Sequence, residues 1–487
     1  MNKESGVLMP IQSLPSPYGC GDFGISAYEF INRLSNTGFR IWQILPLQPL
    51  GYGSSPYQTY SSKAMDELYI SIDALLEDGL LQQDEVKKYY EDSNRIHYKE
   101  VRNYKSKLFK KAFSRFIPDE SYETFKKEDW VNEYAIFNVL RKKNNGAPWV
   151  NWSDEEKFYP EKKTLDLKKY KNKIEYEIFL QYELLKEWNN LKEHAQRMHI
   201  QIMGDIPFYV GQDSDDVWWH KDMFLLDEKG NPKFIAGCPP DYFSETGQRW
   251  GNPIYNWKAI EKDGFKFWMN RLEYVSRLYD ITRIDHFRAF YDYWKIPATC
   301  PTAIEGKWIL APGKKFFTLL FEKYPNINIV AEDLGDKMKN VYKLRDAFHL
   351  KGMTITQQAF DGHYYGDTDE NLIAYTGTHD NAPIEDWYHA LPQEHQEEID
   401  TNLEKLGWGN YGIVDAMIEF TLSRKASTAI IPMFDILRLG AKGRINTPGT
   451  LDEKNWAWKI SSFDSFDKEL GHLHDLLVKY NRINEFK

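Results

Sequence analysis

Eight short apolar stretches, spread along the whole chain, constrain the fold more than any other feature of the sequence. Each is six to nine residues long, is rich in branched or aromatic residues and is bounded by turn residues, as expected of strands buried in a parallel sheet. The stretches are residues 6–11, 39–46, 201–208, 281–287, 328–334, 353–360, 372–380 and 428–436. Segments with helical periodicity separate most of them, so the sequence predicts an α/β fold of the (β/α)8 TIM barrel type. In the segment of residues 26–38, Ser26 is expected to cap the helix and Gly38 to end it.

Two connections between predicted strands are too long for a simple crossover. Residues 61–195 are rich in Lys, Glu, Tyr and Leu with helical spacing, most clearly in residues 174–195, and are expected to form a mostly helical insertion. Residues 212–272 are rich in Gly, Pro and Asp and are expected to form ordered loops over the barrel mouth. The barrel itself is then assigned to residues 1–60, 196–211 and 273–487.

Charge and hydropathy exclude several classes of partner. The net charge of -10 disfavours nucleic acids and anionic membranes, and the locally basic residues 98–116 are interpreted as a solvated helix face. No apolar run is long enough to cross a membrane, and the opening residues lack the pattern of a signal peptide. A soluble cytoplasmic protein is therefore expected. The sequence carries no signal for an oligomeric state.

Motifs for metals and cofactors are absent from the sequence. Cys20, Cys238 and Cys300 lie far apart without CxxC spacing, and there is no HExxH, EF-hand loop, phosphate-binding GxxxxGK[ST] loop or GxSxG elbow. We therefore expect no metal and no cofactor. The pair His379–Asp380 and the HLH triplet of residues 472–474 are the alternative metal ligands that the sequence leaves open.

Acidic residues stand at the carboxyl ends of four predicted strands, namely Asp205, Asp285, Glu332 and Asp380. In barrel enzymes catalysis takes place at this end, because the loops that follow the strands converge there around the axis. Carboxylates that face one mouth repel one another, so their clustering indicates a functional role. Paired carboxylates without a metal-ligand pattern favour glycoside chemistry, in which one attacks or stabilises the anomeric carbon and the other donates a proton.

The neighbours of two carboxylates suggest different roles. Asp285 lies near Arg283, His286 and Arg288, and cations hold a carboxylate ionised, as a nucleophile requires. Arg283 is expected to point into the mouth beside Asp285, whereas Arg288 has a plain salt bridge as its alternative. Glu332 follows the apolar run NIVA, so partial burial should raise its pKa and suit it to act as a general acid. The adjacent Asp333 is expected to face the opposite side.

Aromatic residues make up 15% of the chain, which is a high share for a hydrophilic sequence. Flat rings with a polar edge stack well on the C–H faces of sugars, although additional core packing would explain the same composition.

Nine sequence motifs, distributed from end to end, resemble those of the 4-α-glucanotransferases, also called amylomaltases, within the α-amylase-like barrel enzymes. The motifs are SLPSPYGCGDFG (13–24), WQILPL (42–47), SSPYQ (54–58), GDIPFYV (204–210), CPPDYFSETGQRWGNP (238–253), RIDHFR (283–288), AEDLG (331–335), YTGTHDN (375–381) and RINTPGT (444–450). So many motifs in order are far more specific than any one of them.

The resemblance implies a role for each site residue. It makes Asp285 the nucleophile, Glu332 the acid/base and Asp380 the stabiliser of the transition state. Substrate-binding roles are implied for Ser55, Tyr57, Asp205, Asp241, Tyr242, Phe243, Gln248, Trp250, Arg283, His286, His379 and Asn446. The implied activity is the transfer of α-1,4-glucan segments between maltooligosaccharides or starch- and glycogen-derived chains by a retaining double displacement.

Two alternatives accompany this interpretation. One is an α-glucan hydrolase of the same barrel group, and the other is a non-catalytic glucan-binding protein. The complete set of Asp285, Glu332 and Asp380 argues against the second alternative, because a pure binding protein does not need carboxylates that repel one another.

Overall fold

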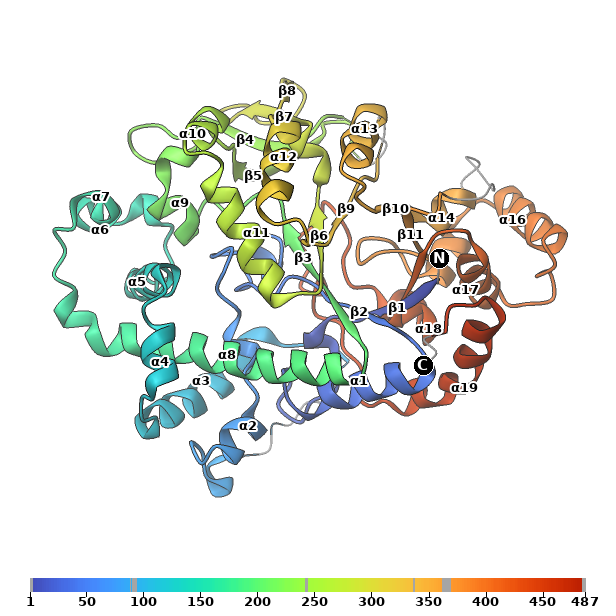
Figure 1. Ribbon diagram of the computed structural model, residues 1–487, viewed down its shortest axis with the longest axis horizontal. Helices are drawn as coiled ribbons and strands as arrows, with labels where there is room; N and C mark the ends of the chain where they lie inside the picture. Colours follow the sequence, from blue (N-terminus) through green and yellow to red (C-terminus); the bar gives the residue numbers. More distant parts are fainter. Residues whose placement is uncertain are drawn as a thin grey trace.

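The computed structural model describes residues 3–87, 89, 94–240, 244–335, 338–360 and 369–483. Eight parallel strands form its central sheet in the order β10-β11-β12-β1-β2-β3-β6-β9 (Figure 1). They are β1 (Glu4–Leu8), β2 (Ile41–Gln43), β3 (Gln201–Pro207), β6 (Ile281–Asp285), β9 (Ile329–Ala331), β10 (Gly352–Ile355), β11 (Leu372–Tyr375) and β12 (Thr428–Pro432). Each lies within or overlaps one of the eight predicted stretches, so the predicted barrel is confirmed.

The barrel closes between β9 and β10, its first and last strands in spatial order. A single parallel bridge joins Val330 to Lys351, and the backbone N–H of Ala331 donates to the carbonyl oxygen of Lys351 at 2.8 Å. All other neighbouring strands pair in parallel over three or more residues. Because every strand is parallel, all eight carboxyl ends open at the same end of the barrel.

Helices connect the strands and cover the outside of the barrel. Their bounds are α1 (Ile25–Thr37), α2 (Ile72–Glu77), α3 (Tyr98–Arg115), α4 (Glu120–Phe125), α5 (Asp129–Lys143), α6 (Asp154–Lys157), α7 (Tyr159–Lys162), α8 (Lys171–Arg197), α9 (Asp215–Trp219), α10 (Trp257–Lys262), α11 (Lys266–Leu278), α12 (Gly313–Lys323), α13 (Lys339–Ala347), α14 (Thr356–Gln358), α15 (Ile384–Ala390), α16 (Gln393–Lys405), α17 (Ile413–Ser423), α18 (Met433–Ile436) and α19 (Asp464–Lys479). Within the described residues, no helix combines the length and the apolarity needed to cross a bilayer.

The long connection between β2 and β3 contains α2 to α8. Figure 1 shows α4 to α7 at one end of the molecule, away from α16 and α19. Helix α8 runs from this end back to the barrel, where the buried Trp188 packs against Phe23 with ring centroids 5.2 Å apart. The second half of α8 therefore covers the barrel and ends at Arg197, two residues beyond the boundary expected at 195.

The segment expected to form ordered loops contains regular structure. Strands β4 (Phe234–Cys238) and β5 (Gln248–Pro253) join β7 (Asp292–Pro297) and β8 (Lys307–Leu310) in an antiparallel sheet of order β5-β4-β7-β8. The expectation of loops in residues 212–272 was therefore wrong for β4 and β5 and for the helices α9 to α11. Gly and Pro interrupt the alternation of β5, which hides it from a search based on hydrophobic period.

Helix α1 begins differently from the sequence expectation. Ser26 was expected to be its N-cap, but the helix begins at Ile25 and Gly24 occupies the cap position without a side-chain hydrogen bond. The predicted stop is confirmed, because Gly38 adopts the left-handed conformation with φ of 100° and its N–H donates to the carbonyl oxygens of Leu34 and Ser35.

A buried lysine joins α3 to the loops near the barrel. Lys105 is fully buried, and its Nζ donates to Asp22 Oδ2 at 2.9 Å and to the carbonyl oxygens of Leu68 and Ile70 at 2.7 and 3.0 Å. All three N–H donors of the ammonium group are thus used. Other lysines of α3, such as Lys107 and Lys110, are exposed, as expected of a solvated basic face.

Replacing Lys105 with Met should lower the free energy of unfolding by about 3–5 kcal/mol, because it leaves the Asp22 carboxylate buried without its cation. Chemical denaturation measures this change. The substitution Lys107→Met, on the exposed side of the same helix, is the matched control and should stay within about 0.5 kcal/mol of the original protein. Equal stability of the two variants would contradict the assigned role of Lys105.

Candidate active site

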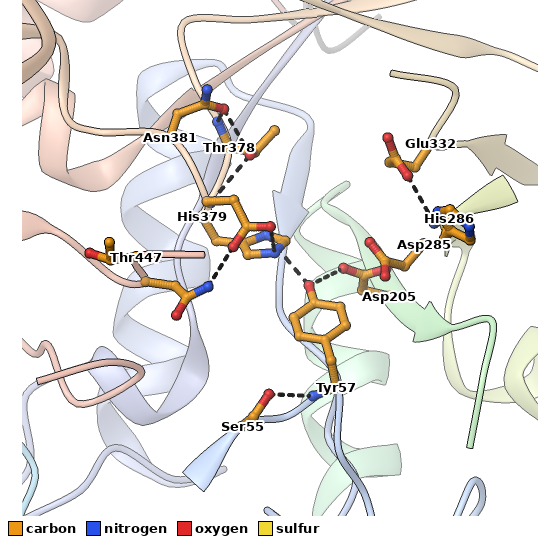
Figure 2. A network of polar contacts seen from close by, with 12 residues as sticks. Ser55, Tyr57, Asp205, Asp285, His286, Glu332, Thr378, His379, Asn381 and Thr447 are labelled. Carbon is orange, nitrogen blue, oxygen red and sulfur yellow. Dashed lines mark hydrogen bonds and ion pairs between the residues drawn. The ribbon is translucent and has the colours of Figure 1, made fainter. Parts of the chain in front are cut away.

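The predicted site residues lie where adjacent strands end. In the register of β3 and β6, Asp205 pairs with Arg283 and Pro207 pairs with Asp285. Glu332 follows directly after β9, and its backbone N–H donates to the carbonyl oxygen of Ile284 in β6 at 3.1 Å. The strand pairing therefore brings Asp205, Asp285 and Glu332 to the same mouth, as Figure 2 shows.

Arg283 stands between two carboxylates in the centre of the site. Its Nη1 donates to both oxygens of Asp205, at 2.8 and 2.6 Å, and its Nη2 lies 3.1 Å from Asp285 Oδ1. The side chains of Asp205 and Arg283 are almost completely buried, whereas 30% of the Asp285 side chain is exposed. Burial lowers the pKa of Arg283, but Asp205 and Asp285 together raise it well above its ordinary value, so the guanidinium stays charged.

Glu332 is fixed by the backbone on both sides. The N–H of His286 donates to Oε2 at 2.8 Å, and the N–H of Leu334 donates to Oε1 at 3.0 Å. His286 adopts the left-handed conformation with φ of 53°, an uncommon state for a non-glycine residue, and this turn directs its N–H toward Glu332. The carboxyl group of Glu332 is therefore hydrogen-bonded to His286, which directly follows Asp285 in the chain.

Burial dominates the electrostatics of both carboxyl groups. It raises the pKa of Asp285 well above its ordinary value, with Arg283 acting against this shift and Asp205, Glu332 and Asp380 adding to it. Burial also raises the pKa of Glu332, although Arg283 and the two backbone N–H groups oppose it. The increase expected for Glu332 from its apolar sequence context is thus confirmed.

Tyr57 links Asp205 to the opposite side of the mouth. Its hydroxyl donates to Asp205 Oδ2 at 2.6 Å and lies 3.4 Å from His379 Nδ1, and its ring stacks on the imidazole with centroids 5.0 Å apart (Figure 2). Burial and Asp205 raise the pKa of Tyr57 well above its usual range, so the phenol keeps its proton. Trp456, with centroids 5.6 Å from Tyr57 and 5.8 Å from His379, completes this aromatic wall.

Burial disfavours the charged form of both site histidines. Burial and Arg288 lower the pKa of His286 to about 4, and burial lowers that of His379 despite the nearby Asp380. Neutral imidazoles both donate and accept hydrogen bonds, which suits a ligand rich in hydroxyl groups.

Asp380 reaches the mouth from the loop after β11. Its Oδ1 accepts from Asn446 Nδ2 at 2.7 Å, and its Oδ2 lies 3.5 Å from His379 Nε2. Within the loop, Asn381 Oδ1 accepts from the N–H and the hydroxyl of Thr378 at 2.8 and 2.9 Å. The Asp380 side chain is 47% exposed, so one carboxylate of the site stays accessible from solvent.

Asp435 anchors both ends of this loop, and sequence reasoning missed it. Its buried carboxylate accepts from the Thr376 hydroxyl at 2.7 Å and from the Ile384 N–H at 2.9 Å, four residues on either side of Asp380. Burial raises the pKa of Asp435 to about 7. The signal was present, because Asp435 lies near the carboxyl end of the eighth predicted strand stretch, as the four chosen acids do in theirs.

Strand β5 supplies an aromatic side chain at the mouth. The Trp250 ring meets His286 edge to face at 4.8 Å, and its Nε1 donates to Gln248 Oε1 at 3.2 Å. Ser55 stabilises the turn before Tyr57, since its hydroxyl oxygen accepts from the Tyr57 N–H at 3.2 Å. The remaining predicted binding residues, Asp241, Tyr242 and Phe243, lie outside the described residues.

Several neighbouring residues have structural roles instead. Arg288 forms an ion pair with Asp292 at 2.7 Å and stacks over Trp308 at 3.8 Å, so the salt-bridge alternative is confirmed. Asp333 faces away from the site and pairs with Arg345 at 2.6 Å, as expected.

The alternative metal ligands form no metal site in the described part of the chain. There, no three or more His, Cys, Asp or Glu side chains are grouped so that they could hold a metal ion. His379 packs instead on Tyr57, and His474 Nδ1 lies 3.1 Å from the carbonyl oxygen of Thr37.

Comparisons with known proteins agree with this geometry. Residues 9–464 match the family described as 4-alpha-glucanotransferase. The chain is 40% identical to a 4-alpha-glucanotransferase of Clostridium butyricum, covering 95% of this chain and 97% of the relative, and 37% identical to one of Streptococcus pneumoniae, covering 99% and 98%.

A solved structure gives the same result. The amylomaltase of Streptococcus agalactiae, in complex with acarbose, superposes with a TM-score of 0.94 at 34% identity and covers 99% of this chain and 100% of that chain. Because these matches extend over almost the whole length, the chain belongs to the 4-alpha-glucanotransferase family of transglycosylating barrel enzymes.

Proposed function

We propose that this enzyme moves segments of α-1,4-linked glucan between maltooligosaccharides or longer glucans by a retaining double displacement. The observation that carries the proposal is the hydrogen bond from the backbone N–H of His286 to Glu332. His286 follows Asp285 directly, so this bond keeps the carboxyl groups of Asp285 and Glu332 close together at the ends of neighbouring strands. A retaining mechanism needs two carboxyl groups about 5–5.5 Å apart, one on each side of the bond that breaks.

The first displacement breaks the glycosidic bond. Asp285 attacks C1 of the donor glucose while Glu332 gives its proton to the leaving oxygen, so a covalent glycosyl–Asp285 ester forms and the shortened chain departs with a new hydroxyl. Asp380, held by Asn446, binds ring hydroxyls more tightly as positive charge develops at C1.

The second displacement restores the enzyme. Glu332 removes the proton from the 4-hydroxyl of an acceptor glucan, the oxygen attacks C1, and Asp285 leaves as a carboxylate. Because each displacement inverts the anomeric carbon, the product keeps the α configuration.

The charges of the site favour this division of roles. Burial raises the pKa of both carboxyl groups and Glu332 raises that of Asp285 further, so ionising both groups at once is costly. Arg283 lowers the pKa of both groups, and its Nη2 lies 3.1 Å from Asp285 Oδ1, a direct contact that supports Asp285 as the group that reacts in its ionised form. A nucleophile and a general acid result from the same pair.

Transfer exceeds hydrolysis only if a sugar competes successfully with water for the intermediate. Trp250 supports acceptor binding, since it lies against His286 at the mouth and presents an apolar ring to the incoming glucose. An ordered acceptor beside the ester lowers the entropic cost of attack, which favours transfer.

Incubation with maltotriose tests the reaction class. We expect glucose and a ladder of longer maltooligosaccharides, while the number of reducing ends stays nearly constant because each broken bond is replaced by another. Chromatography with a reducing-end assay measures both quantities. A steady rise in reducing ends would identify the protein as a hydrolase instead.

Replacing Asp285 with Ala should reduce turnover by more than about 10⁴-fold, because no covalent intermediate can form. Binding of maltooligosaccharides, measured by calorimetry, should persist. The matched control Asp292→Ala removes a carboxylate that pairs with Arg288 and should retain most of the activity. Unchanged product formation by the Asp285 variant would refute its role as nucleophile.

The pH dependence of kcat/KM should be bell-shaped and displaced toward neutral pH. Asp285 acts as a carboxylate, so activity falls as pH drops through its pKa; Glu332 acts as an acid, so activity falls as pH rises through its own. Burial raises both pKa values, so both limbs should lie above the range near 4 that is typical of free carboxyl groups. Initial rates from pH 3 to 9 measure the profile.

A substrate that needs no proton isolates the alkaline limb. With α-maltosyl fluoride as donor and azide as acceptor, Glu332→Gln should remain active without an alkaline limb, because fluoride leaves and azide attacks without proton transfer. Persistence of that limb in the variant would assign it to a residue other than Glu332.

The variant Asp435→Ala should lower kcat roughly 10- to 100-fold, because it removes the acceptors of both the Thr376 hydroxyl and the Ile384 N–H and so releases the loop that carries Asp380. Steady-state kinetics with maltotriose measure the change. Asp415→Asn, which removes an ion pair with Arg438 outside the mouth, is the control with unchanged kcat. Normal kcat in the Asp435 variant would show that the loop holds its position without this residue.

A further inference from the structure

A cavity of about 500 Å³ lies between α16 and the start of α17, outside the barrel mouth. Its volume falls within the range of small-molecule sites, roughly 300–1,000 Å³. Figure 1 shows α16 at the periphery of the molecule, at the opposite end from α4 to α7. None of the described active-site residues lines this cavity.

Two aromatic side chains give the cavity an apolar wall. Trp408 is held in place by Phe420, with ring centroids 5.7 Å apart and planes at 85°. Tyr411 is 45% exposed, an unusual position for a large aromatic ring, and its N–H donates to the carbonyl oxygen of Trp408 at 3.1 Å. The backbone of this turn packs closely on α16, since a Cβ atom at Gly409 would come within 2.9 Å of the Glu404 side chain.

Carboxylates supply the polar side of the cavity. Glu397, Asp400 and Glu404 line it, and the orientation of Asp400 is fixed by the Tyr388 hydroxyl, which lies 2.9 and 2.8 Å from its two oxygens. A carboxylate oxygen has more than one lone pair, so Asp400 can accept further hydrogen bonds from a ligand.

The lining restricts the chemistry of the ligand. Among the described residues that line the cavity there is no Lys, Arg or His, so anions are disfavoured. A metal ion is disfavoured as well, because the three acids do not converge on one point. In the described portion of the chain, no three or more His, Cys, Asp or Glu side chains are grouped so that they could hold a metal ion. Rings and carboxylates suit either an organic cation or a ligand with apolar C–H faces and many hydroxyl groups. Of these two, the second is the chemistry of the glucan proposed above as the substrate.

We propose that this cavity is a second glucan-binding site, which holds a short stretch of an α-1,4-glucan chain away from the barrel mouth. The proposal rests on the function proposed above, since it assigns the same class of substrate to a separate surface. A long glucan held at this site has a raised effective concentration at the active site, whereas maltotriose is too short to gain from it. The site should therefore affect the use of polymers only.

The variant Tyr411→Ala tests the proposal, because an exposed ring can be removed without disturbing the core. We expect the KM for amylopectin to rise roughly threefold to tenfold, as for the loss of one stacking contact, with kinetics on maltotriose unchanged. Migration through gels that contain amylopectin, measured with Asp285→Ala as an inactive background, should become faster in the double variant.

Two further variants sharpen the result. Trp408→Ala removes the second ring and should have the same effect; its thermal unfolding is compared with that of the original protein, because Trp408 packs on Phe420. Tyr342→Ala removes an exposed tyrosine on α13, outside the cavity, and should change neither the KM for amylopectin nor the migration.

The outcomes separate this proposal from the function on which it rests. Unchanged retention by amylopectin in a folded Tyr411→Ala variant would overturn the second site, as would an equal loss of activity on maltotriose and on polymer. Failure of the original protein to lengthen maltotriose would instead refute the proposed transfer reaction, while the retention assay still reports on binding at the cavity.

Discussion

The buried ion pair between Arg283 and Asp205 is the constraint on which the rest of the site depends. A charged guanidinium buried within a barrel is tolerated only when its partners are fixed, and here the bidentate contact from Asp205 and the contact to Asp285 meet that condition. Adjacent strands β3 and β6 present both partners in register, so the backbone pairing sets the geometry. Asp205 is thus held by Arg283 and by the Tyr57 hydroxyl, whereas Asp285 is the more exposed of the two.

The fold was predictable from the sequence wherever burial alone determines the structure. Each barrel strand is covered on both sides and therefore appears as an apolar run, which is why all eight were found. The second sheet was missed because its strands are partly exposed and β5 contains both Gly and Pro, so neither hydrophobicity nor alternation marks it. The N-cap of α1 was misplaced by two residues, because Gly24 takes the cap position that Ser26 was expected to fill.

The candidate site was predictable to a different extent. The position of an acid after a buried strand located Asp205, Asp285, Glu332 and Asp380, because parallel strands bring their carboxyl ends together. The same rule applied to Asp435, but a residue that acts by anchoring a loop cannot be distinguished by sequence position from one that faces the mouth. Trp456 was missed for another reason, since it lies beside Tyr57 and His379 only after a loop near the end of the chain folds back across the barrel.

The helical insertion helps to hold the loop that carries Tyr57. The Ser61 hydroxyl donates to Asp215 at 2.9 Å and the Ser62 N–H to Asp216 at 2.8 Å, so the loop that carries Tyr57 is attached to the start of α9. From the insertion, Arg141 of α5 stacks over Tyr60 at 3.6 Å and pairs with Asp213 at 3.0 Å. Arg141 therefore contacts both the loop that carries Tyr57 and the segment that leads into α9. Since Tyr57 orients Asp205, which in turn holds Arg283, a helix far from the mouth helps to determine the environment of Asp285.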